Sequence, residues 1–143
     1  MKKILLLLLF ASTIAMAQRG EKLKAYKTAF ITEALDLTAS EAEKFWPIYN
    51  VHEDKMMALR KSERKEIFET VRHNLESLSE EEANKLIDRM VDLKSKEFTY
   101  EKELIQNLKG ILPAKKIIRL KKAEEEFKHM LLDKFRNRKG RHP

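Results

Sequence analysis

The sequence contains no cysteine and only three glycines and three prolines among its 143 residues. Without cysteine the chain has no disulfide, no thiolate metal site, no thiol redox chemistry and no attachment residue for a lipoprotein anchor. So few glycines and prolines do not supply the frequent turns that β structure needs. The sequence also lacks a glycine-rich phosphate loop and a nucleophile motif. We therefore expect no enzymatic activity and no cofactor.

Charged side chains, by contrast, are abundant and make up 37% of the residues, with lysine, glutamate and leucine prominent. This composition is typical of long helices. It predicts an all-α protein with a single helical domain over residues 18–137 and a basic flexible tail at 138–143.

The N-terminus has three parts: the cationic MKK, the apolar ILLLLLFASTIA, and the small-x-small triplet Ala15-Met16-Ala17. This layout is typical of a secretory signal peptide, here over residues 1–17. The alternative is a membrane anchor, but the apolar run is shorter than the ~20 residues that span a bilayer. We expect a soluble, exported, periplasmic protein that begins at Gln18 and is not a lipoprotein.

The chain is basic, with 30 Lys and Arg against 23 Asp and Glu. Removing Lys2 and Lys3 with the leader gives 30 − 2 − 23 = +5. In an intracellular protein this excess would favour nucleic acid, but for an exported protein we expect none. The surface instead suits anionic envelope components or acidic, unfolded polypeptide. The basic tail KFRNRKGRHP can equally be a solvated, frayed end.

Two stretches, LTASE and LSEEE, repeat a helix-start motif. In each, a hydroxyl residue is followed three positions later by glutamate, which predicts a capping box, and a leucine precedes the cap. The motif comprises Leu37, Thr38, Glu41, Leu78, Ser79 and Glu82. Pro113 suits a third helix start, and Gly110 suits the end of the helix before it. These signals predict helices at about 21–36, 39–76, 80–109 and 113–137.

The short connections predict antiparallel neighbours, and Pro47 should bend the second helix. We expect elongated, bent hairpins with a thin core that needs a second chain, and hence a homodimer. Glu63 and His52 within the apolar seam favour the same conclusion. The expected seam is Ala42, Phe45, Tyr49, His52, Met56, Leu59, Glu63, Ile67, Val71 and Leu75, then Ala83, Leu86, Met90, Leu104, Ile105 and Leu108 with a polar gap around 94–97, then Ile117, Leu120, Ala123, Phe127, Met130 and Leu131.

A second apolar stripe lies off this seam. Trp46, Met57 and Phe68 are eleven residues apart, about three helical turns, and Arg60 and Arg64 fall on the same side. Such a surface can hold partly unfolded chains, because apolar groups catch exposed side chains and charges attract them. The alternative is that this face packs against the first helical segment or another protomer.

His52 raises the question of a metal site. Met56 one turn later would suit Cu(I), and the adjacent Glu53 would suit Zn or Ni. One histidine makes no site, however, and the other histidines lie far along the chain. Because a histidine on an apolar seam is more often a hydrogen-bonded core residue, we expect no bound metal.

The phrases "EAEKFWPIYN" and "LPAKKIIRLKKAEEEF", together with the two helix starts, resemble the Spy/CpxP superfamily of periplasmic proteins, whose hallmark is an LTxxQ motif. The likeness is greatest to the Bacteroidetes-type branch labelled as sensors of extracytoplasmic-function sigma factors, and related branches sense heavy metals. Glu41 and Glu82 stand where the hallmark has glutamine.

The resemblance implies an ATP-independent chaperone or envelope-stress protein that forms a dimeric cradle. Its partners would be unfolded or partly folded envelope proteins. The alternative is a regulatory sensor that docks on a membrane-bound signalling protein of a sigma-factor pathway. A heavy-metal sensor is a third possibility, although the ligand patterns of that branch are not visible here.

Overall fold

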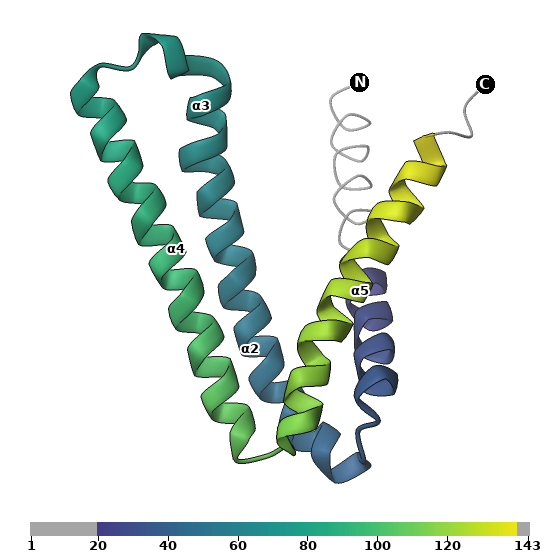
Figure 1. Ribbon diagram of the computed structural model, residues 1–143. Helices are drawn as coiled ribbons and strands as arrows, with labels where there is room; N and C mark the ends of the chain where they lie inside the picture. Colours follow the sequence, from purple (N-terminus) through teal and green to yellow (C-terminus); the bar gives the residue numbers. More distant parts are fainter. Residues whose placement is uncertain (1–19, 140–143) are drawn as a thin grey trace, which may run out of the picture. The chain divides into compact units, whose positions relative to one another are not determined.

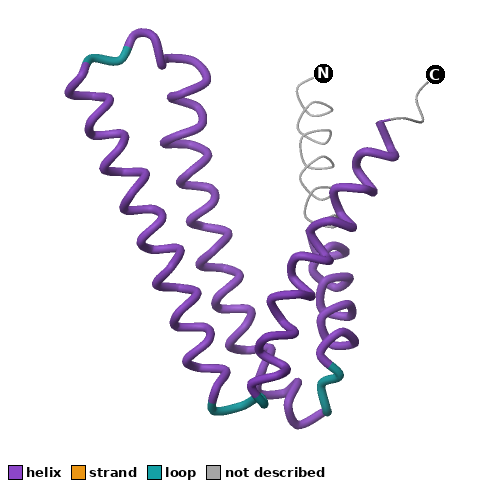
Figure 2. The backbone as a smooth tube through the Cα atoms, viewed as in Figure 1, coloured by secondary structure: helices purple, strands orange, loops and turns teal. Residues whose placement is uncertain are grey.

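The computed structural model describes residues 20–139, and these are helical almost throughout (Figures 1 and 2). No strand occurs within this range, which confirms the all-α fold class. Residues 1–19, which include the predicted leader, and residues 140–143 lie outside the described part of the chain. The elements in order are a helix at 20–35, α2 (Ala39–Glu63), a π-helix (Arg64–Phe68), α3 (Glu69–Asn74), a 3-10 turn (Leu75–Ser77), α4 (Glu80–Lys109) and α5 (Ala114–Lys139).

The start of α4 has the predicted capping box. The backbone N–H of Glu82 donates to the Ser79 hydroxyl at 3.2 Å, and the backbone N–H of Ser79 donates to the Glu82 carboxylate at 2.8 Å. The backbone N–H of Ser79, together with the Ser79 hydroxyl that donates to the same carboxylate at 2.9 Å, holds the pKa of Glu82 below its ordinary value. Two of the N–H groups that a helix start leaves unpaired are thereby satisfied.

The other predicted helix starts also lie close to their expected positions. Helix α2 begins at Ala39, directly after Thr38. Helix α5 begins at Ala114, one residue later than predicted, and the carbonyl of Pro113 accepts a hydrogen bond from the N–H of Ile117 at 3.3 Å. The first turns of α2, which contain Pro47, run at an angle to the rest of that helix in Figure 1, as expected for an internal proline.

The described residues form two compact units: 20–38 with 118–139, and 39–117. In the first unit the ring of Phe127 lies 5.5 Å from Phe30 and 5.7 Å from Tyr26, measured between ring centroids. The Tyr26 hydroxyl donates to the sulfur of Met130 at 3.2 Å. The buried residues of this unit are Ile31, Leu35, Leu120, Ala123 and Phe127. The last part of the predicted seam is therefore confirmed at Leu120, Ala123 and Phe127, whereas Met130 and Leu131 are half-buried.

The second unit is a hairpin in which α4 runs antiparallel to α2 and packs beside it (Figure 1). Its buried residues are Phe45, Tyr49, His52, Met56, Ile67, Leu93, Leu104, Leu108, Leu112 and Ile117. The prediction was wrong for Val71, Leu75 and Met90, which are exposed. The reason is that α3 and α4 diverge toward their connection (Figure 1), so seam residues there have no opposing surface to cover them.

Two further features of the hairpin differ from the sequence prediction. The predicted continuous helix over 39–76 is interrupted by the π-helix at Arg64–Phe68. Leu93 is buried at the edge of the expected polar gap, where the seam had no predicted residue. The domain boundaries drawn from the sequence stay a prediction.

Candidate binding face of the α2–α4 hairpin

The stripe predicted on α2 and the π-helix lies largely open to solvent. Met57 and Phe68 are exposed, with 66% of Met57 accessible, whereas Trp46 is half-buried. The indole of Trp46 packs edge-on against Phe45 at 4.9 Å and Tyr49 at 5.6 Å between ring centroids. Trp46 is thus fixed on the hairpin core, while Met57 and Phe68 are available for contact.

The alternative, that the first helical segment packs on this stripe, stays a prediction, because that segment belongs to the other compact unit. Within its own unit, the rings of Tyr26 and Phe30 contact Phe127. Covering by a second protomer stays open as a separate interpretation.

Helix α4 adds a second exposed stripe that the sequence analysis missed. Ile87, Val91 and Phe98 are exposed, and Phe98 reaches 71%. Their spacings of four and seven residues place them on one side of the helix. The signal that could have revealed this stripe is its regular spacing, which places the three residues on a different side of α4 from the buried Leu93 and Leu104.

The two stripes lie on the same side of the hairpin. On α2 and the π-helix, the exposed residues directly follow the seam: Trp46 after Phe45, Met57 after Met56, and Phe68 after Ile67. On α4, Ile87 likewise follows Leu86, and Val91 and Phe98 continue its line.

Each step along an α-helix turns about 100° in the same sense. Because α2 and α4 are antiparallel and turn their seams toward each other, a one-residue advance past the seam leads to the same side of both. We call these six side chains the apolar face: Trp46, Met57, Phe68, Ile87, Val91 and Phe98.

The opposite side of the hairpin carries ion pairs made by residues that directly precede the seam, together with the exposed Val51. Lys55, before Met56, donates to Glu103 at 2.7 Å, and this bond raises the pKa of Lys55. Glu66, before Ile67, accepts from Arg89, with one of the bonds 3.0 Å long. The hairpin therefore has one ionic side and one apolar side.

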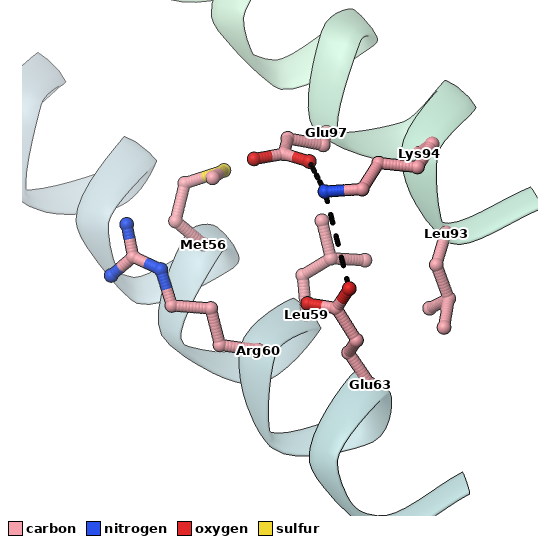
Figure 3. A pocket seen from close by; sticks show the side chains of 7 residues that line it. All are labelled: Met56, Leu59, Arg60, Glu63, Leu93, Lys94 and Glu97. Carbon is pink, nitrogen blue, oxygen red and sulfur yellow. Dashed lines mark hydrogen bonds and ion pairs between the residues drawn. The ribbon is translucent and has the colours of Figure 1, made fainter. Parts of the chain in front are cut away.

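The arginines predicted for the site lie beside the apolar face without neutralising partners. Arg60 and Arg64 are exposed, and neither has an ion-pair partner among residues 20–139. In Figure 3 the guanidinium of Arg60 points away from Glu63 and Glu97, whose carboxylates instead pair with Lys94 at 3.9 and 2.7 Å. Positive charge thus accompanies the exposed apolar groups.

The pocket drawn in Figure 3 is too small for an organic ligand. It has room for about one water molecule. Its lining residues, drawn in Figure 3, are Met56, Leu59, Arg60, Glu63, Leu93, Lys94 and Glu97. Any binding at this site is therefore binding to the surface.

His52 is a buried residue of the hairpin core. Its Nε2 lies 3.6 Å from a carboxylate oxygen of Glu101 on α4, and Met56 is part of the same buried seam. Within residues 20–139 no group of three or more His, Cys, Asp or Glu side chains is arranged to hold a metal ion. The described residues thus give the metal-sensor interpretation no site.

No protein-family model matches the chain, and the comparisons with curated proteins and with solved structures find no match. In the described part of the chain, no helix is both long and apolar enough to cross a bilayer. The resemblance to Spy/CpxP proteins stays a prediction.

Proposed function

We propose that this protein is an exported, ATP-independent chaperone that holds exposed apolar segments of partly unfolded proteins on its apolar face. One observation supports this most: six apolar side chains from two antiparallel helices gather on one side of the hairpin, beside Arg60 and Arg64. The other side carries paired charges. Export through the leader at residues 1–17 and assembly as a homodimer belong to the same proposal.

The chemistry of the face fits a weak, reversible grip. Covering one exposed Met, Phe or Val side chain contributes about 1.5–3 kcal/mol at most. A client that contacts two or three of them, after the ordering cost of binding, is held only moderately tightly. Such clients leave without an energy source, which is what a holding chaperone without ATP requires.

The arginines extend the distance over which the apolar face attracts a client, and they keep the face hydrated. Unpaired cations attract acidic segments over roughly 8–10 Å at physiological ionic strength. They also keep an exposed apolar surface hydrated, which limits self-aggregation. Rim charges of this kind act mainly on the rate of association.

The test is suppression of the aggregation of a model substrate by the exported protein without nucleotide. Met57→Ser combined with Phe98→Ser removes the two most exposed members of the apolar face and should abolish most of the suppression. Neither residue is in the core, so helical content measured by circular dichroism should stay unchanged.

Val51→Ser is the matched control, because Val51 is also exposed but directly precedes the seam residue His52 and so lies on the ionic side. Equal suppression by the double variant and the native protein would refute the proposal. Cross-linking in the envelope adds a second readout. A broad mixture of clients supports a chaperone, whereas one stoichiometric membrane protein would indicate a dedicated signalling partner instead.

A further inference from the structure

The last turns of α5 present a second exposed apolar pair, far along the chain from the apolar face. Leu132 and Phe135 are 56% and 60% exposed. Three residues apart on a helix, they share one side. Lys128 lies one turn before Leu132, and Arg136 one turn after it, so two cations extend the same side.

The other side of these turns is anchored within its own unit. Phe127 is buried and contacts the rings of Tyr26 and Phe30. Met130 accepts the hydrogen bond from the Tyr26 hydroxyl. With one side of the helix fixed in this way, Leu132 and Phe135 cannot turn inward and remain directed outward.

This segment is strongly basic. From residue 128 to residue 143 there are six Lys and Arg and one Asp, so the net charge is 6 − 1 = +5. The carboxylates near the exposed pair form only local contacts: Asp133 with Arg136 at 3.0 Å, and Glu125 with Lys128 at 3.7 Å. Such exposed pairs are weak, so the cations remain free to exchange partners.

We infer that this side of α5 docks on the surface of an anionic lipid membrane. A basic helix with Leu and Phe on its exposed side lies in the plane of the interface, with the apolar groups among the acyl chains and the cations at the headgroups. A nucleic acid would use the cations but would leave Leu132 and Phe135 without a role. The inference is independent of the proposed chaperone activity, because it involves other residues on another helix.

The experiment uses protein secreted by a bacterial host, with its N-terminus determined by mass spectrometry. Co-sedimentation is measured with vesicles of phosphatidylcholine alone and with vesicles that contain about one third phosphatidylglycerol. We expect binding to the anionic vesicles, a steep decrease as salt is added, and little binding to the neutral ones. Equal binding to both compositions, or none to either, would overturn the inference.

Variants separate lipid docking from general attraction to polyanions. Leu132→Ser with Phe135→Ser should weaken vesicle binding at least about tenfold, and Lys128→Glu with Arg136→Glu should do the same. Val51→Ser, an exposed apolar residue elsewhere, should bind as the native protein does. Heparin is the probe for charge alone: its binding should fall with the charge variant but not with the apolar one. If the apolar variant binds anionic vesicles as tightly as the native protein, the surface is a polyanion site and the inference is wrong.

Discussion

Arg89 of α4 makes a two-pronged contact with Glu66 of the π-helix: Nε donates to one carboxylate oxygen, and Nη2 donates to the other at 3.0 Å. Arg89 also donates to Asp92, which in turn accepts from Lys96 at 3.1 Å. This network lies on the ionic side of the hairpin and joins α4 to the π-helix, directly before α3. It thus ties the irregular turn to the opposite helix where apolar packing ends.

This contact predicts a pH-dependent contribution to stability. The hydrogen bond from Arg89, opposed by partial desolvation, holds the pKa of Glu66 below its ordinary value of 4.5. A carboxyl with a lowered pKa in the folded state stabilises the fold above its unfolded pKa, and this contribution is lost as pH falls through the folded pKa. Glu66→Gln should therefore lower the urea midpoint at neutral pH, and the gap from the native protein should close in acid.

Both side chains are partly exposed, so the effect on the midpoint is small. Arg89→Lys is the informative companion, because it keeps the charge but removes the two-pronged geometry. A gap between Glu66→Gln and the native protein that is constant from pH 7 down to about pH 3 would show that the ion pair is not its cause.

Truncating the buried side chain of Leu93 should change stability more than Glu66→Gln does. Leu93 is 3% exposed on the inner side of α4, whereas Val91, two residues earlier, is 64% exposed. Leu93→Ala should reduce the free energy of unfolding by about 2–5 kcal/mol, measured by urea denaturation. Val91→Ala should change it by less than about 0.5 kcal/mol. A similar loss in the free energy of unfolding for the two variants would mean that α4 packs with a different side inward.

These residues also show what the sequence could and could not predict. The capping box at Ser79 and Glu82 is local chemistry, and so the start of α4 was predicted correctly. Seam periodicity indicates which side of a helix turns inward but not whether another helix lies opposite it. For that reason Leu75 was assigned to the core although α3 and α4 separate near it. The π-helix at Arg64–Phe68 has no local sequence signal that we can identify.

For a related reason, the sequence predicted only the part of the candidate site that lies on α2 and the π-helix. The stripe on α2 was visible because Trp46, Met57 and Phe68 are large and evenly spaced. The stripe on α4 can be recognised as part of the site only when the antiparallel pairing is known, because that pairing places Ile87 and Phe98 on the same side of the hairpin as the α2 stripe. A pairwise relationship between helices distant in sequence is absent from the periodicity of either one.

The end of the first helix offers a prediction about backbone strain. Asp36 has φ 49°, in the left-handed region, and the N–H groups of Asp36 and Leu37 donate to the carbonyls of Glu33 and Thr32 at 3.0 and 3.2 Å. This pattern is a Schellman motif, in which glycine is favoured at the left-handed position. Asp36→Gly should therefore raise the free energy of unfolding by about 0.5–1 kcal/mol, measured by urea denaturation.

Gly110, expected from the sequence to end α4, is the matched comparison. It is the C-cap residue but has φ −84°, and a Cβ at this position would meet no atom within 4 Å. Gly110→Ala should therefore be neutral or stabilising by up to about 1 kcal/mol, because it restricts the unfolded chain. Destabilisation by Asp36→Gly would mean that the side chain of Asp36 contributes more than its backbone costs.

The unpaired arginines lead to a kinetic prediction that separates the two parts of the proposed grip. Replacing Arg60 and Arg64 together by Gln should slow the capture of an acidic unfolded client, by about two- to tenfold at low ionic strength, and should flatten the dependence of the rate on salt. Met57→Ser with Phe98→Ser should instead speed release, because the apolar packing that these two side chains provide forms only after encounter. Stopped-flow fluorescence with a labelled client measures both rates.

Lys55→Gln is the control, since Lys55 is already paired with Glu103 on the ionic side. If the arginine variant changes only the release rate, the cations contact the bound client directly and do not guide it from a distance.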